Sequence, residues 1–168
     1  MSLVKSVNDF LEVWNYESTS TLKVFANLTD ESLNQKVTPD GRSLGFLAWH
    51  ITHSIGEMMG RTGLEFPGFT EDAAPLKTIG EIKNEYERLS NLMVAQIKEK
   101  WNDGMLQDDL NMYGQTWKRA DVLSSLTAHQ AHHRGQMTVL MRQAGLCVPG
   151  IYGPSKEEWA EYGMPTVE

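Results

Sequence analysis

The five histidines of this chain fall into two short clusters, and imidazole is a side chain that can bind metals or transfer protons near neutral pH. Three of them, His129, His132 and His133, lie within five consecutive positions, whereas His50 and His53 lie far upstream. Neutral imidazole binds zinc, nickel, iron and copper. A fold that brings the two clusters together would therefore create a metal site.

Helical periodicity separates the three downstream histidines. Residues from about 118 to 144 are predicted to form one long helix, because their apolar residues recur at helical spacing. His129 and His133 lie one turn apart on its apolar stripe, while His132 points to one side. Two inward imidazoles at positions i and i+4 can direct their nitrogens at one ion, so this pair is a candidate for metal binding.

The upstream cluster lies on a second predicted helix, which begins at Ser43 and ends near Arg61. His50 falls at the border of its apolar stripe, where it could reach the downstream pair, and His53 falls further toward solvent. Three imidazoles from two helices would leave one coordination position open for water or substrate, as in catalytic zinc sites. The alternative is that these histidines are core residues bonded to ordinary protein partners.

Two further residues could assist such a site. Glu57 lies on the same border as His50 and could act as a base or support a ligand; the alternative is a solvated ion pair with His53. Gln136 could orient a ligand histidine or bond a neighbouring backbone group. The His-Glu-x-x-His signature of metalloproteases is absent, so no general base of that kind stands beside the histidines.

Four long amphipathic helices are predicted, over residues of about 3–28, 43–61, 78–100 and 118–144. Thr78 to Glu81 matches a capping box, and Gly145 is a natural stop for the last long helix. Residues 105–117 could form a short hairpin or a loop, and Ser155 is expected to cap a short last helix carrying Trp159. The pattern predicts an all-α helix bundle in one domain spanning residues 1–168.

Composition narrows the classes of protein. The chain has 168 residues, of which 40% are hydrophobic and 22% charged, so it can bury a substantial core. A net charge of −7 without a basic block argues against nucleic-acid binding. No apolar run is long enough for a membrane span, no signal peptide is visible, and the single cysteine, Cys147, fits a reducing compartment. A cytoplasmic protein is expected.

The sequence resembles the DinB-like (YfiT-like) family. The resemblance is carried by His-x-x-His-His-Arg-Gly-Gln over residues 129–136 and by Ser-Leu-Gly-Phe-Leu-Ala-Trp-His over residues 43–50, and it extends over nearly the whole chain. It implies an up-and-down four-helix bundle, often a homodimer, in which three histidines hold a divalent metal, usually nickel or zinc. Carried over by motif, the ligands are His50, His129 and His133. His53 departs from the simplest form of the pattern.

The resemblance also implies a kind of reaction. Characterised members of this family include transferases that join low-molecular-weight thiols to electrophiles, and a mycothiol-dependent isomerase. The expectation is a metal-dependent enzyme that transfers a thiol to a small electrophile, with no nucleic-acid or membrane partner. A metal-dependent hydrolase and a non-catalytic, dimeric metal-binding module are the alternatives; in the latter, Trp49, Val139 and Met141 would be interface residues.

Overall fold

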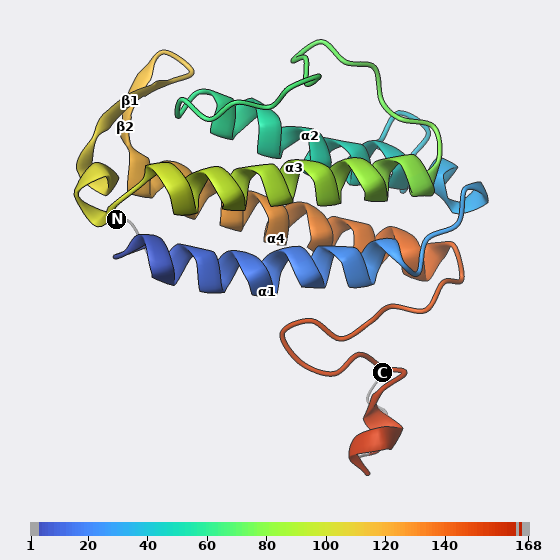
Figure 1. Ribbon diagram of the computed structural model, residues 1–168. Coiled ribbons are helices and arrows are strands. Elements are labelled where there is room, and N and C mark those ends of the chain that lie inside the picture. The colour runs from blue at the N-terminus through green and yellow to red at the C-terminus, as the bar shows by residue number, and fades with distance from the viewer. Residues whose placement is uncertain (1–3, 164, 166–168) are drawn as a thin grey trace.

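Four long helices pack side by side in the computed structural model, which describes residues 4–163 and 165 (Figure 1). They are α1 (Val7–Phe25), α2 (Leu44–Gly60), α3 (Ile79–Lys100) and α4 (Arg119–Gln143). The described residues also form the 3₁₀ turns η1 (Glu31–Asn34), η2 (Asp103–Gln107) and η3 (Trp159–Tyr162) and the antiparallel strands β1 (Asp109–Met112) and β2 (Gln115–Lys118). The predicted all-α four-helix bundle, with a short helical turn at its C-terminal end, is confirmed.

The order of helix directions follows from one long connection. Residues 61–78 carry the chain back along the bundle, so that α2 and α3 run in the same direction and α1 and α4 run in the opposite one (Figure 1). At one end of the bundle the N–H of Ile79 donates to the Asp30 carboxylate, and at the other the N–H of Val7 donates to Asp103, both at 2.8 Å. Helix directions therefore do not alternate between α2 and α3, which differs from the up-and-down order that the family resemblance implies.

Local sequence sets the helix ends. The Ser43 hydroxyl accepts a hydrogen bond from the N–H of Phe46 and caps α2, and Thr78 and Glu81 form the predicted capping box of α3. α4 ends just before Gly145, whose φ of 72° lies in the left-handed region that glycine adopts without strain. These caps confirm the boundaries expected for α2, α3 and α4.

Of the two alternatives for residues 105–117, the structure shows a hairpin, preceded by η2. Tyr113 and Gly114 form the turn, with φ values of 55° and 79°. Positive φ at both central positions is the type I′ geometry that matches the twist of two short strands. The Asn111 side chain supports the turn by accepting from the N–H of Gly114 at 3.1 Å.

The C-terminal helical turn differs from the one predicted from the sequence. Ser155 is predicted to cap a short helix, but η3 begins only at Trp159, and the Ser155 hydroxyl has no hydrogen-bond partner among the described residues. Instead, the Glu158 carboxylate accepts from the backbone N–H groups of Ser155 and Gly150, at 3.1 Å and 2.8 Å. A carboxylate therefore closes this turn, and the proposed serine cap is wrong.

The four helices enclose one apolar core, which explains a second difference. Trp49 and Met141, expected at an interface if the chain is a dimeric module, are buried in this core, whereas Val139 is exposed. Met141 has no exposed surface and cannot meet a partner, so that expectation is wrong for Met141. Among the helices that the structure describes, none has the length and the hydropathy needed to cross a membrane.

Candidate metal centre

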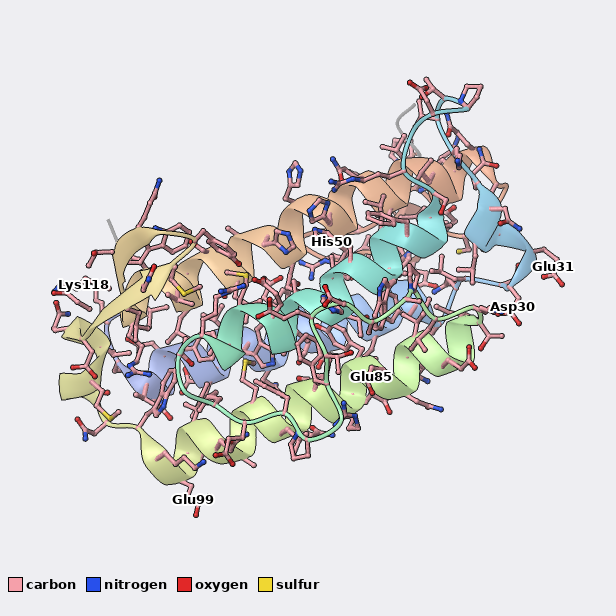
Figure 2. The ribbon with its side chains drawn as sticks, turned by 90° about the horizontal axis from the view of Figure 1, so that it is seen from above. Asp30, Glu31, His50, Glu85, Glu99 and Lys118 are labelled. Carbon is pink, nitrogen blue, oxygen red and sulfur yellow. The ribbon has the colours of Figure 1, made fainter. Side chains whose placement is uncertain are left out.

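Three histidines from two helices meet between α2 and α4. Nε2 of His50 lies 3.0 Å from Nε2 of His129, and the His50 ring centroid is 4.6 Å from that of His133. Each of the three residues offers a ring nitrogen, and these nitrogens lie within 4.8 Å of one another. Figure 2 shows His50 on the side of α2 that faces α4. The predicted convergence of His50, His129 and His133 is thus present in the fold.

Helical spacing and helix packing place the three rings. His129 and His133 lie one turn apart on α4, and their ring centroids are 4.5 Å apart. α2 packs along α4, which brings His50 to the same level from the opposite side. His133 is buried, while His50 and His129 are half-buried. The cluster therefore lies partly at the surface, with His133 on its buried side.

Gln136 selects the tautomer of His133. Its side-chain oxygen lies 2.7 Å from Nδ1 of His133, and because an amide oxygen can only accept, Nδ1 donates the proton. Nε2 of His133 therefore keeps a free lone pair, the form in which imidazole binds a metal. Of the two roles considered for Gln136, orienting a histidine is the one that the geometry supports.

The three rings are held in the neutral form. Burial, and then the repulsion that His133 exerts when it is protonated, lower the pKa of His50 and of His129 to about 4. Burial also lowers the pKa of His133. Uncharged imidazoles are required for metal binding, so no proton has to be displaced near neutral pH.

The donor set fits a divalent cation. Two facing Nε2 atoms at 3.0 Å can share only one proton, and Nδ1 of His129 is buried without a hydrogen-bond partner among the described residues. A cation between the rings would accept both Nε2 lone pairs at once. Three nitrogen ligands suit zinc, nickel, iron or copper, and the geometry does not distinguish among them.

The other two histidines lie outside this group. His53 packs between Trp49 and Phe69, with ring centroids at 5.1 Å and 4.7 Å, and its Nε2 lies 3.2 Å from the Thr70 carbonyl oxygen. His132 is exposed, and its Nε2 lies 3.2 Å from the Gln136 side-chain nitrogen. Neither His53 nor His132 adds a ligand atom to the group of His50, His129 and His133.

Glu57 is engaged by other groups. Its carboxylate accepts from Arg61 at 2.9 Å and from the Tyr113 hydroxyl at 2.7 Å. The alternative ion pair with His53 is wrong, because Arg61, one turn further along α2, takes its place. The carboxylate therefore has two donors of its own and is not poised as a free base.

Gln130, which the sequence pattern did not single out, ties the four helices together behind the histidines. Its side-chain N–H donates to the Ile51 carbonyl at 2.7 Å, and its oxygen accepts from Tyr86 at 3.2 Å and from Thr21 at 3.5 Å. Gln130 is fully buried and directly follows His129, while Ile51 directly follows His50. The signal for it in the sequence is a glutamine on the inward face of a helix.

Fold and site together define a class: a helical bundle with a three-histidine cluster between two of its helices. The DinB family model matches residues 2–166, and the chain belongs to the DinB family. The "Uncharacterized protein YrdA" of Bacillus subtilis (strain 168) is 45% identical over 163 residues, covering 96% of this chain and 97% of that protein.

Solved structures agree with this assignment. A DinB-like protein from Bacillus cereus ATCC 10987 superposes with a TM-score of 0.85 at 40% identity, over 89% of this chain and 100% of that one. A DinB-like protein (YjoA) from Bacillus subtilis superposes with a TM-score of 0.68 at 16% identity, over 88% and 99% of the two chains. At that low identity the second likeness shows a shared fold alone.

Proposed function

We propose that this chain is a metal-dependent enzyme that transfers a thiol to a small electrophile, with zinc or nickel held by His50, His129 and His133. The observation that carries the proposal is the meeting of three neutral imidazoles on a partly open face of the bundle. Three protein ligands leave a position for substrate, which is typical of catalytic sites and not of closed structural sites. A homodimer acting in the cytoplasm belongs to the same proposal.

The residues of the chain would prepare this site before a substrate arrives. His50, His129 and His133 would hold a divalent ion, which would lower the pKa of a thiol or of water at its open position. Gln136 fixes the ring of His133, and the buried bonds of Gln130 hold α2 against α4. Because these groups are already held by hydrogen bonds, little reorganisation would be needed on binding.

One observation favours thiol transfer over hydrolysis. A hydrolase of this kind needs a base beside the bound water, and Glu57, the candidate base, is held by Arg61 and Tyr113. A thiol, whose ordinary pKa is about 8.5, needs a much smaller shift than water to ionise near neutral pH, so it depends less on such a base. The hydrolase remains the second candidate because both reactions use the same three ligands.

The first test is metal analysis of protein purified without a nickel column. Wild type is expected to carry close to one divalent ion per chain, and His129→Ala is expected to lose it while keeping its helical circular dichroism. His132→Ala removes an exposed histidine from the same helix and should retain the ion. Equal metal in wild type and His129→Ala would refute the site.

The second test is a conjugation screen with the metal-loaded enzyme. Small thiols are combined with a panel of electrophiles, and product formation is expected with wild type and not with His50→Ala. Hydrolysis of esters or amides in the absence of any conjugation would favour the second candidate. If His50→Ala keeps full activity, the catalytic assignment of the cluster fails.

A further inference from the structure

Arg42 differs from the other arginines of this chain because it forms no ion pair among the described residues. Among the described residues, the other five each form an ion pair with a carboxylate: Arg61, Arg88, Arg119, Arg134 and Arg142. Arg42 is exposed and has no carboxylate within ion-pair distance in the part of the chain that the structure describes. The carboxylate of Asp40, the nearest acid in sequence, is hydrogen-bonded by the Thr38 side chain, which lowers the pKa of Asp40.

The position of Arg42 links it to the histidine cluster. Its guanidinium lies over the ring of Phe46, 5.2 Å from the centroid, and Phe46 stacks on His50 at 5.9 Å with an interplanar angle of 11°. The three residues follow one another at intervals of four, so they form a row that leads from the loop before α2 to the first histidine. The charge of Arg42 also contributes to the lowered pKa of all three histidines.

Arg42 is exposed and hydrated, but its charge has no counter-ion among the described residues and lies beside a cation site. A divalent ion held by neutral imidazoles keeps its full positive charge, and Arg42 adds another nearby. A thiolate at the ion would offset part of that charge, and a second anionic group on the same molecule would offset Arg42. The ion and Arg42 together therefore favour a ligand that carries one negative charge in addition to the atom that binds the metal.

We propose that Arg42 and Phe46 form a carboxylate subsite beside the histidine cluster, so that the substrate carries a carboxylate a few bonds from the atom held at the histidines. This inference rests on the proposed function, whose substrate class it narrows. One arginine balances one charge, and its planar fork matches a carboxylate through two parallel hydrogen bonds. Stacking on Phe46, which is 39% exposed, orients the fork and leaves its edge free.

The test measures direct binding to cobalt-loaded protein, in which the visible spectrum reports each ligand that reaches the metal. Two matched pairs serve as probes: mercaptopropionate with mercaptopropanol, and imidazole acetate with methylimidazole. The charged member of each pair is expected to bind wild type about tenfold more tightly, the gain typical of a partly exposed, charge-assisted contact. Arg42→Gln should abolish this preference, and Arg42→Lys should keep part of it.

A control removes a positive charge from the same loop. Lys36→Gln changes a side chain that bonds the Pro39 carbonyl and does not stack on Phe46, so it should keep the full preference. Equal binding of the charged and neutral probes by wild type would overturn the subsite, as would an equal loss of both in Arg42→Gln. A preference lost equally in Lys36→Gln would also overturn it, because the effect would then be one of net charge.

The two pairs separate this inference from the proposed function. If neither thiol reaches the cobalt while imidazole acetate is still preferred through Arg42, the thiol reaction fails and the subsite stands. If both thiols bind with equal affinity, the subsite fails and the thiol reaction stands. A protein that binds no cobalt would overturn both.

Discussion

At the scale of single residues, His133 owes its metal-binding form to one neighbour. Its Nδ1 donates to Gln136 at 2.7 Å, and this bond fixes both the proton and the ring orientation. His50 and His129 owe their neutral form to burial, which lowers the pKa of each to about 4. The chemistry of the cluster therefore depends on side chains that would not bind the metal themselves.

Replacing Gln136 with Leu is expected to weaken zinc binding by about 10- to 100-fold, the usual effect of removing the partner of a ligand histidine. Competition with a fluorescent zinc chelator measures the change. Gln143→Leu makes the same substitution on an exposed part of α4 and should have no effect. Unchanged affinity in Gln136→Leu would show that the bond is not needed to orient the ring.

The lowered pKa values also predict how stability depends on pH. In metal-free protein, His50 and His129 titrate near pH 4, while in the unfolded chain they titrate near 6.5. Between these values the unfolded state binds more protons, so the free energy of unfolding falls as the pH drops from about 6.5 to about 4. Because both rings are partly exposed, we expect a loss of roughly 1–3 kcal/mol and not the full value of the shifts.

Urea unfolding of chelator-treated protein at several pH values measures this dependence. His50→Gln should show a shallower loss over the same window, because one of the two titrating groups is gone. Identical pH profiles for the variant and wild type would mean that these rings do not carry the lowered pKa values.

At the scale of elements, the cluster exists because α2 and α4 pack at one register. Gln130 fixes that register through its bond to the Ile51 carbonyl, and it reaches Thr21 on α1 and Tyr86 on α3 as well. One buried amide thus contacts all four helices directly behind the histidines. Its loss would leave the Ile51 carbonyl and the Tyr86 hydroxyl with fewer partners in a dry core.

Gln130→Leu is expected to lower the free energy of unfolding by about 1–3 kcal/mol, the cost of removing hydrogen bonds from buried polar groups. It should also weaken metal binding, because His50 and His129 adjoin the two ends of the lost bond. Denaturation and chelator competition measure the two effects separately. A variant that loses stability but keeps wild-type metal affinity would show that Gln130 has no part in positioning the ligands.

At the scale of the whole molecule, a buried ion pair joins the first and last long helices. Arg134 is 1% exposed and pairs with Glu17 on α1, while the Tyr152 hydroxyl from the C-terminal segment donates to the same carboxylate at 2.8 Å. Tyr16 adds a second anchor by donating to the Ile151 carbonyl. The segment after α4 is therefore held against α1 by polar contacts (Figure 1).

Glu17→Gln should lower the free energy of unfolding by about 3–5 kcal/mol, because it leaves the Arg134 charge buried without a counter-ion. Chemical denaturation measures the loss, and Glu12→Gln on the exposed face of α1 is the control. The double variant Glu17→Leu/Arg134→Met should recover much of the stability, since it removes both charges. A double variant as unstable as Glu17→Gln would contradict this account.

The sequence alone was enough to predict the four helices, the caps at Ser43 and Thr78, and the inward pair His129 and His133. These features follow from local rules: helical periodicity, capping chemistry and the spacing of one turn. His50 as the third member of the cluster was predicted from its helix face and from the family resemblance together. Its meeting with the other two still required α2 and α4 to pack at the right level.

Only the tertiary structure decided the rest. Four features depend on residues far apart in the chain. They are the parallel course of α2 and α3, the contacts of Gln130, the burial of Arg134 and the lack of an ion pair at Arg42. Local pattern cannot predict such contacts, because it gives the face of a helix on which a side chain lies but not what packs against that face. Helix packing therefore determines which polar groups pair with one another and which are free to bind a ligand.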